Sequence, residues 1–348
     1  MTRREQLSRR QFLQRSAITG GALLASGRPG VVWAQKPAVT ISTQLNWIKT
    51  VDFAGFYIAD SRGYYTQESI KAQLLPGGPN LQGVESIVAG GSADVGIATL
   101  LTSVIDGVTR GSDFVVFATV FQTSPLVLVS KPDKPVRSAK DLLGKRIGGP
   151  QGRQREIEAV FKINNLPTNY TFVPVGYGPQ PLTQGDVDVL SAYTTDVPLV
   201  LAKQGIQTVQ VSYKDLGLPT YSNALFASRK NIDKQRDALV GYLRATIKGW
   251  EMNAKDPTLG ARLAVEQYGA DLGLKFDDEV KKNEVQIPLT QSDLTKAKGL
   301  LWIDRDYITG PIYDGLRAAG RTSLPAVEKF VDTSLLAEAY GGKTSLLS

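Results

Sequence analysis

The sequence predicts an α/β protein of two lobes with a cleft between them, in which the second lobe is inserted into the first. Three observations predict this fold. Short β-rich runs alternate with helical segments between residues 39 and 228, which is typical of α/β architecture. A polar, proline-bearing stretch at 131–135 separates two such series and indicates a crossing between lobes. From Ile232 onward the pattern is almost wholly helical, as expected for C-terminal helices that pack on the first lobe.

The first series of elements begins at residue 39. Residues 39–45 alternate between apolar and polar side chains, as in a half-buried strand. Phe53, Phe56 and Tyr57 recur at i, i+3 and i+4, which predicts a helix over 53–61. The same patterns predict strands at 71–75, 94–98, 114–120 and 126–129 and a helix at 81–89.

A second series follows the proline-bearing stretch. It opens with a turn at 138–142, in which Ser138 is placed to cap the first helical residues. These elements assign residues 35–130 and 224–348 to the first lobe and residues 131–223 to the second. We predict strands at 146–149, 172–175, 187–192 and 208–211, helices at 156–164 and 197–204, and a return strand at 224–228.

The first 34 residues have the layout of a cleaved export leader. Arg9 and Arg10 precede a weakly apolar run at 16–25, and Ala34 offers a small residue for cleavage. The paired arginines predict a Tat-type signal peptide over residues 1–34, with an amphipathic cytoplasmic helix as the alternative. The apolar run is too short and too rich in Gly and Ser to span a membrane. We therefore predict a periplasmic protein that begins near Gln35.

The charge of the chain depends on this leader. The sequence has 40 basic and 33 acidic residues and a net charge of +7. Six basic residues and one acidic residue precede Gln35, which leaves 34 and 32 and a net charge of +2. No block of Lys and Arg with interleaved aromatic residues remains after the leader, so we expect no nucleic-acid partner.

The sequence has no cysteine and no histidine. This composition excludes Ser-His-Asp and Cys-His catalysis, disulfides, and metal sites built from thiolate or imidazole ligands. Carboxylate or lysine chemistry stays open, but no Gly-rich phosphate loop ending in Lys-Ser or Lys-Thr occurs. We therefore predict that the chain is not an enzyme and that it carries no cofactor and no metal.

Candidate ligand-binding residues lie on loops at strand ends, because open α/β sheets bind ligands beyond the carboxyl ends of their strands. Trp47 follows the first strand and can stack on a flat ring, while Asn46 can hydrogen-bond a ring edge. Packing in the core is the alternative for Trp47 and for Phe53. Gly77 and Gly78 allow a close backbone approach, although a plain turn would also use them. The remaining candidates of the first lobe are Phe53, Thr99, Phe121 and Gln122.

The second lobe supplies four more candidates from corresponding loops. Tyr177 and Tyr193 are expected to stack on the ligand from that side, and Gln151 lies on a Gly-rich loop. Asp196 precedes a predicted helix, so its carboxylate can accept a hydrogen bond from an exocyclic amine or cap the helix.

Spaced motifs recur along nearly the whole chain after residue 35. In the first lobe they are Leu45-x-Trp47, Phe53-Ala54-Gly55-Phe56-Tyr57, Gly63-Tyr64-Tyr65, Pro76-Gly77-Gly78, Ala93-Asp94-Val95-Gly96-Ile97 and Phe121-Gln122. In the second they are Asp141-Leu142-x-Gly144-Lys145 and Pro181-Leu182-x2-Gly185-x-Val187-Asp188. Together these motifs resemble the solute-binding proteins of the SsuA/THI5-like (NMT1) group. The resemblance implies a clamshell of the periplasmic binding protein type II class.

The resemblance also implies a function. Such a receptor closes on a small-molecule ligand and delivers it, as a monomer, to an inner-membrane ABC permease and its ATPase. Trp47 followed by Phe53-Ala54-Gly55 is most similar to receptors for thiamine-precursor pyrimidines of the hydroxymethylpyrimidine or formylaminopyrimidine type. Receptors for riboflavin, or for alkanesulfonates or nitrate, are the alternatives. This chain departs from the pyrimidine receptors where it has Asn46 and Thr195 in place of an acidic residue and Asn, which leaves the ligand open.

An enzyme of the same fold is the alternative from another class. The fungal THI5-like pyrimidine synthase resembles this chain in fold, but it depends on a histidine and a cysteine-rich iron site. The sequence contains neither residue type, and an export leader does not suit a cytosolic biosynthetic enzyme. The resemblance therefore favours a receptor.

Overall fold

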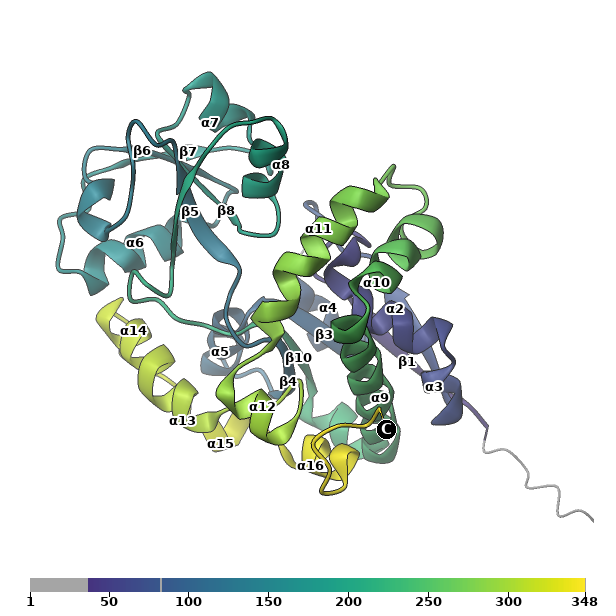
Figure 1. The fold of residues 1–348 in the computed structure, drawn as a ribbon. Coiled ribbons are helices and arrows are strands. Elements are labelled where there is room, and N and C mark those ends of the chain that lie inside the picture. The colour runs from purple at the N-terminus through teal and green to yellow at the C-terminus, as the bar shows by residue number, and fades with distance from the viewer. Residues whose placement is uncertain (1–36, 82, 348) are drawn as a thin grey trace, which may run out of the picture. The chain divides into compact units, whose positions relative to one another are not determined.

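The computed structural model describes residues 37–81 and 83–347. The predicted signal peptide at 1–34 lies outside the described residues. Two five-stranded mixed sheets form the framework, and helices pack on both (Figure 1). None of the described helices combines the length and the apolar character that a membrane crossing needs.

The first sheet contains the N-terminal strands and one strand from much later in the chain. Its order is β2-β1-β3-β10-β4. Strand β1 pairs in parallel with β2 and β3, whereas β10 is antiparallel to both β3 and β4. The strands are β1 (Val39–Gln44), β2 (Ile70–Leu75), β3 (Val95–Leu100), β4 (Phe114–Phe121) and β10 (Ser222–Ser228).

The second sheet has the order β7-β6-β8-β5-β9. Strand β6 pairs in parallel with β7 and β8, and β5 is antiparallel to β8 and β9. The strands are β5 (Leu126–Ser130), β6 (Arg146–Gly149), β7 (Thr171–Pro174), β8 (Val189–Tyr193) and β9 (Val209–Ser212).

The first crossing between lobes differs from the predicted boundary at residue 130. Strand β5 belongs to the second sheet, so the chain crosses between Phe121 and Leu126 and returns between Ser212 and Ser222. Every residue of β5 is buried. A continuous apolar run has no polar face that would indicate to which sheet it belongs. The boundary inferred from the prolines at 131–135 is therefore wrong, because the crossing precedes β5. That stretch is a turn within the second lobe.

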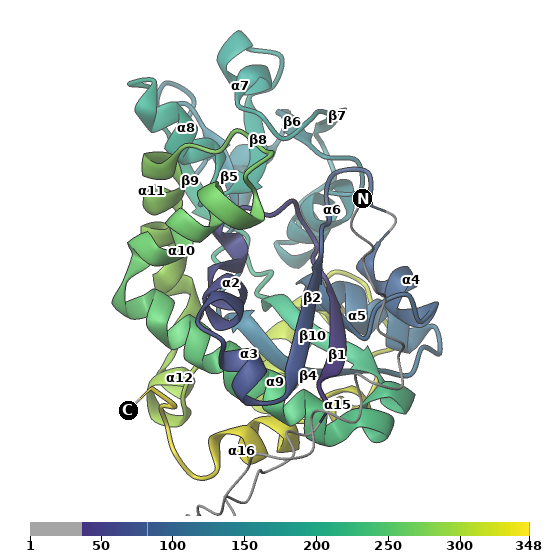
Figure 2. The same cartoon turned by 90° about the vertical axis from the view of Figure 1, so that its right-hand side faces the viewer.

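Helices cover both faces of the first sheet. Helices α2, α9 and α10 lie on one side of it, and α4 and α5 lie on the other (Figure 2). The long helix α9 packs along α2 and α3, and α16 packs on β4 and α9. Most C-terminal helices thus lie on the first lobe, but α14 contacts α6 of the second lobe.

The α-helices are α2 (Ala54–Ser61), α3 (Tyr64–Gln67), α4 (Val84–Ala89), α5 (Leu101–Thr109), α6 (Gln154–Ile163), α7 (Gln180–Gln184), α8 (Val197–Lys203), α9 (Arg229–Lys255), α10 (Pro257–Leu263), α11 (Phe276–Gln286), α12 (Asp293–Lys298), α13 (Arg305–Tyr307), α14 (Tyr313–Ala318), α15 (Val327–Phe330) and α16 (Ser334–Tyr340). Shorter 3₁₀ turns and π-helical segments are η1 (Val51–Phe53), η2 (Ala139–Leu142), η3 (Ala264–Tyr268), η4 (Ile287–Thr290) and η5 (Ile308–Ile312).

The Phe-Ala-Gly motif at the start of α2 is a packing motif. A Cβ atom on Gly55 would lie 2.3 Å from Cγ of Trp250, and one on Gly249 would lie 1.9 Å from the carbonyl oxygen of Gly55. A Cβ on Gly260 of α10 would lie 2.5 Å from that of Ala54. Small residues are therefore required here because α9 and α10 approach α2 closely.

Candidate ligand-binding site

Loops from both lobes surround a cavity of about 680 Å³. In the first lobe these loops follow β1, β2 and β3, and in the second lobe they follow β6, β7 and β8. Strand β10 and helix α11 add residues from the C-terminal half. The volume falls within the range of small-molecule sites, which are concave and combine apolar walls with a few polar groups.

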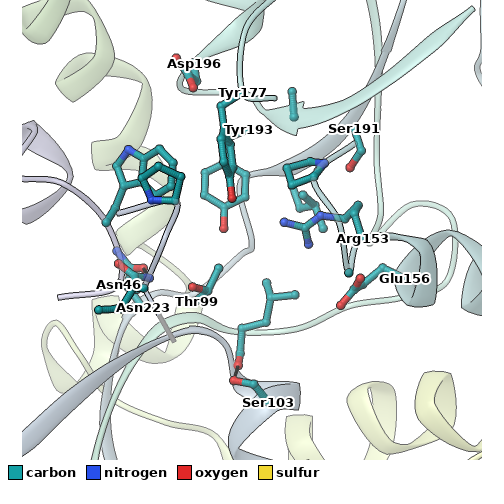
Figure 3. A pocket seen from close by; sticks show the side chains of 18 of the residues that line it. Asn46, Thr99, Ser103, Arg153, Glu156, Tyr177, Ser191, Tyr193, Asp196 and Asn223 are labelled. Carbon is teal, nitrogen blue, oxygen red and sulfur yellow. Dashed lines mark hydrogen bonds between the residues drawn. The ribbon is translucent and has the colours of Figure 1, made fainter. Parts of the chain in front are cut away.

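Aromatic side chains form one part of the wall. Trp47 comes from the loop after β1, Tyr177 from the loop after β7, and Tyr193 from the end of β8. The Trp47 and Tyr177 rings, one from each lobe, contact each other directly, with centroids 4.5 Å apart and planes at 59°. The Tyr193 and Tyr177 side chains occupy the same part of the view in Figure 3. These three rings offer a flat ligand stacking or edge-to-face partners from both lobes.

A pair of asparagines forms the neighbouring polar wall. The Asn46 side chain donates from Nδ2 to Oδ1 of Asn223 at 2.9 Å, which joins the end of β1 to β10 (Figure 3). Asn223 has φ of 51°, in the left-handed region that a non-glycine residue rarely adopts. Asparagine is among the residues that tolerate this conformation. The second Asn46 amide hydrogen and the remaining lone pairs of both amides are available to a ring edge.

Charged residues line the other side of the cavity. Arg153 and Glu156 come from the start of α6, and Arg321 follows α14. Figure 3 shows Arg153 and Glu156 well separated from Asn46 and Asn223, with Tyr193 between the two groups. Burial raises the pKa of the Glu156 carboxyl, although Arg153, Arg155 and Arg321 act in the opposite direction.

A second group of charges surrounds Lys282 of α11, which lines the cavity together with Asp52 and Asp196. Burial acts to lower the pKa of Lys282, and the carboxylates of Asp52, Glu279 and Asp196 act to raise it. The effect of the carboxylates is larger, so the pKa of Lys282 lies above its ordinary value. The Lys282 Nζ lies 3.7 Å from Oε1 of Glu279. Because Asp196 belongs to the second lobe and Lys282 to a helix on the first, their attraction favours closure of the lobes.

Nine of the twelve predicted ligand-binding residues line this cavity. Asp196 is at the N-cap position of α8, yet its side chain makes no capping hydrogen bond. Burial raises the pKa of its carboxyl, against the attraction of Lys282. The nine are Asn46, Trp47, Gly78, Thr99, Phe121, Gln151, Tyr177, Tyr193 and Asp196.

Three predicted residues do not line the cavity. Phe53 is fully buried in the core of the first lobe, because the short turn before α2 directs its ring toward the helices. Gly77 supports the loop after β1: its N–H donates to the Trp47 carbonyl at 2.9 Å, and a Cβ there would lie 2.4 Å from the Leu45 carbonyl oxygen. Gln122 is buried, with Nε2 donating to the Trp302 carbonyl and Oε1 accepting from Ser292.

The cavity also contains residues that were not predicted. Asn223 lies at the amino end of an antiparallel strand, which reaches the same edge of the sheet as the carboxyl end of β3. A polar residue at the start of an apolar return strand is the signal that would have identified it. Glu156 and Lys282 lie on helices whose inward faces depend on tertiary packing, so their sequence positions carry no such signal. The other unpredicted polar residues include Asp52, Ser103, Ser191 and Arg321.

Two α/β lobes with an aromatic and amide-lined cavity between them form a two-lobed protein with a concave site of small-molecule size. The architecture is that of periplasmic binding proteins of type II. The chain belongs to the NMT1/THI5-like family, whose profile, described as "NMT1/THI5 like", matches residues 50–259.

Two curated relatives span most of the chain. Riboflavin-binding protein RibY of Chloroflexus aurantiacus is 24% identical over 308 residues, which cover 84% of each chain. A 4-amino-5-hydroxymethyl-2-methylpyrimidine phosphate synthase of Legionella pneumophila is 23% identical over 279 residues, which cover 77% of this chain and 83% of that protein.

Solved structures show the same fold. The alkanesulfonate-binding protein SsuA from Xanthomonas axonopodis pv. citri, bound to MOPS, superposes with a TM-score of 0.61 at 14% identity and covers 85% of this chain and 99% of that one. The aliphatic sulphonate binding protein SsuA of Escherichia coli gives a TM-score of 0.62 at 15% identity, with 84% and 91% covered. These identities support a common fold and no common ligand.

Proposed function

We propose that the chain is the ligand-binding component of an ABC importer and that its ligand is a small heteroaromatic molecule. The observation that carries this proposal is the aromatic wall of the cavity, to which Trp47, Tyr177 and Tyr193 contribute from both lobes. A flat ring packed against these residues would contact both lobes at once and stabilise the closed state through aromatic contacts. The monomeric receptor would then present the closed form to a membrane permease.

The asparagine pair supports a heteroaromatic ring over an aliphatic anion. Amide groups of Asn46 and Asn223 can both donate to and accept from ring nitrogens and exocyclic groups. Thiamine-precursor pyrimidines and riboflavin both present such edges. The names of the relatives, a riboflavin-binding protein and a pyrimidine phosphate synthase, agree with these two ligand classes.

A synthase is the alternative from another class, because two relatives carry that name. The chain has no histidine or cysteine to supply imidazole or thiolate chemistry. A receptor requires only the cavity and the closure of its lobes, so we favour a receptor.

The proposed place of action is the periplasm. The paired arginines Arg9 and Arg10 precede a short apolar run, in the layout of a Tat-type leader cleaved near Ala34. Replacing both with lysine should retain the precursor in the cytoplasm, as measured by cell fractionation. Undiminished export of the double variant would contradict the Tat assignment but not the receptor.

A ligand screen by thermal shift tests the receptor itself. The panel is a hydroxymethylpyrimidine, riboflavin, taurine and nitrate. A ligand at 100 times its Kd raises the free energy of unfolding by about 2.7 kcal/mol, which moves Tm visibly. The proposal expects a response to a ring compound and none to taurine or nitrate; the reverse result would overturn it.

Trp47 provides the matched test of the site. Trp47→Ala should weaken ring binding by roughly 1–3 kcal/mol, if stacking here has the strength of base–aromatic stacking. It should also remove the change in tryptophan fluorescence on binding. The control is Trp302→Phe, because Trp302 stacks on Tyr340 in the first lobe and does not line the cavity. Equal binding by both variants would contradict the aromatic site.

A further inference from the structure

Helix α11 is fixed to the first lobe through the loop that carries Trp47. The Val51 N–H donates to Oε2 of Glu279 at 2.7 Å, and Nε2 of Gln286 donates to the Val51 carbonyl at 2.8 Å. All three residues are buried. Val51 begins the turn η1 directly after the Trp47 loop. Because α11 holds both backbone groups of Val51, the helix and the Trp47 loop move as one body.

The same helix meets α8 of the second lobe through charged side chains. Lys203, the last residue of α8, donates from Nζ to Oδ1 of Asp278 at 2.6 Å. At the other end of α8, Asp196 is among the carboxylates whose charge acts on Lys282. A groove of about 640 Å³ lies between α8 and Val285 of α11. The lobes therefore meet on the α8–α11 flank through charges and without close packing.

The opposite flank of the two lobes is apolar. Figure 1 shows α8 beside α11 on one side of the molecule and α6 beside α14 on the other. Ile157 and Phe161 of α6 belong to the same buried apolar cluster as Tyr313 and Leu316 of α14. Separating α6 from α14 would expose apolar surface to water, whereas separating α8 from α11 would expose charges that water solvates. Opening therefore costs less on the α8–α11 flank.

We propose that α11 is the closure element of the protein: the lobes part between α8 and α11, and the Lys203–Asp278 ion pair holds them together on that flank. This inference rests on the proposed function, because it takes the lobes to open and close around a ligand. The side chains of Lys203 and Asp278 are 61% and 46% exposed, so their attraction is weak and reversible. Because α11 also holds the Trp47 loop, the Trp47–Tyr177 contact forms and breaks together with this pair.

Distances between spin labels in the purified protein, measured without ligand, test where the lobes part. The sequence has no cysteine, so only introduced cysteines are labelled. One pair, Gln184→Cys on α7 and Lys281→Cys on α11, spans the flank that opens. The other pair, Lys162→Cys on α6 and Glu328→Cys on α15, spans the opposite flank. Double electron–electron resonance gives the ratio of closed to open molecules for each pair.

Charge reversal at Asp278 tests the ion pair. Asp278→Lys should lower the ratio of closed to open molecules by about three- to fivefold at low salt, because it replaces an attraction with a repulsion. Combining it with Lys203→Asp should restore the wild-type ratio. The effect of Asp278→Lys should shrink in about 1 M sodium chloride, where the screening length is about 3 Å. Asp277→Lys is the control, because Asp277 is the neighbouring exposed residue of α11 and takes no part in the ion pairs that the described residues form.

The link to the Trp47 loop has its own measurement. Trp47 emission, taken as the difference from the same protein with Trp47→Phe, should shift in Asp278→Lys and recover when Lys203→Asp is added. An unshifted emission in a protein whose label distances change would overturn this link.

The outcomes separate this inference from the proposed function. An unchanged ratio in Asp278→Lys, or one that Lys203→Asp does not restore, would overturn the role of the ion pair. An equal change in Asp277→Lys, or a larger change between α6 and α15 than between α7 and α11, would overturn the position of the opening. Failure of every ring compound to bind would overturn the proposed function and would leave these distances as they are, because no ligand enters their measurement.

Discussion

The rings of Trp47 and Tyr177 contact each other from opposite lobes, with centroids 4.5 Å apart. Trp47 is carried by the loop after β1, which Gly77 supports through its hydrogen bond to the Trp47 carbonyl. Tyr177 is carried by the loop after β7 and is 48% exposed. Because each ring moves with its own lobe, this contact requires the two lobes to be close. We therefore expect the fluorescence of Trp47 to respond to closure of the lobes as well as to the proposed ligand.

Tyr177→Ala should weaken ligand binding and accelerate release. The variant loses the tilted aromatic partner of Trp47 and one side of the aromatic wall, and aromatic pairs contribute about 0.5–1.5 kcal/mol beyond buried area. Tyr177→Phe retains the ring and should bind as the wild type does. Stopped-flow tryptophan fluorescence would measure both rates. Leu143→Ala, at another exposed apolar residue of the second lobe, is the control, and an equal effect there would contradict the role of Tyr177.

Asn223 allows binding to be separated from folding. Its φ of 51° favours glycine, so Asn223→Gly should leave Tm nearly unchanged, whereas Asn223→Ala should lower stability by about 1–2 kcal/mol. Both variants lose the amide that pairs with Asn46, and ligand affinity should fall in both. Denaturant unfolding and ligand titration would be compared. Wild-type affinity in Asn223→Gly would show that this amide does not contact the ligand.

Strand-end loops were predictable from the sequence because their geometry follows from the sheet. Trp47 and Tyr193 follow recognisable strands, and the carboxyl ends of parallel strands share an edge with the cavity. The sequence leaves Phe53 with two interpretations, a ligand contact or packing in the core, because whether its ring faces the cavity or the core depends on how the short turn packs against the helices. Local periodicity carries no information on that choice.

Long-range contacts account for what could not be predicted. Strand β5 is buried along its whole length, so its membership of the second sheet follows only from pairing with β8 and β9. Asn223 and Glu156 reach the cavity from an antiparallel strand and from the first turn of a helix, respectively. Their positions depend on how the two lobes assemble, which a single sequence does not reveal.

Gly55→Val should destabilise the protein without acting through the ligand. The new side chain would meet the Trp250 ring, whose Cγ lies 2.3 Å from the position of a Cβ, where no space exists. Overpacking of this kind costs typically about 1–3 kcal/mol. Chemical denaturation would measure the loss. Gly310→Ala is the control, because no side chain or other segment of the described residues lies within 4 Å of the Cβ position there, outside the glycine's own helix backbone and its two chain neighbours. A comparable loss in both variants would argue against this packing explanation.

Asp94 ties β1 and β3 to the kink in α9, and its ionisation should make stability depend on pH. The carboxylate accepts from the Ser42 N–H at 2.9 Å, from the Ser42 hydroxyl at 2.7 Å, and from Nε2 of Gln235 at 3.0 Å. Gln235 is the residue at which α9 departs from helical geometry. Burial acts to raise the pKa of Asp94, but the hydrogen bonds from Ser42 and Gln235 outweigh it and hold the pKa below its ordinary value of 3.8.

The sign of the pH effect follows from this lowered pKa. The folded state favours the ionised carboxylate more than the unfolded chain does, so the added stability is complete above about pH 3.8 and is lost as the pH falls through the folded pKa. Asp94→Asn should therefore be less stable than the wild type at pH 7, and the difference should shrink only as the pH falls below about 3.8. Urea denaturation at a series of pH values would measure it, with the exposed Asp271→Asn as the control. A difference that stays constant across this range would show that the Asp94 charge does not contribute.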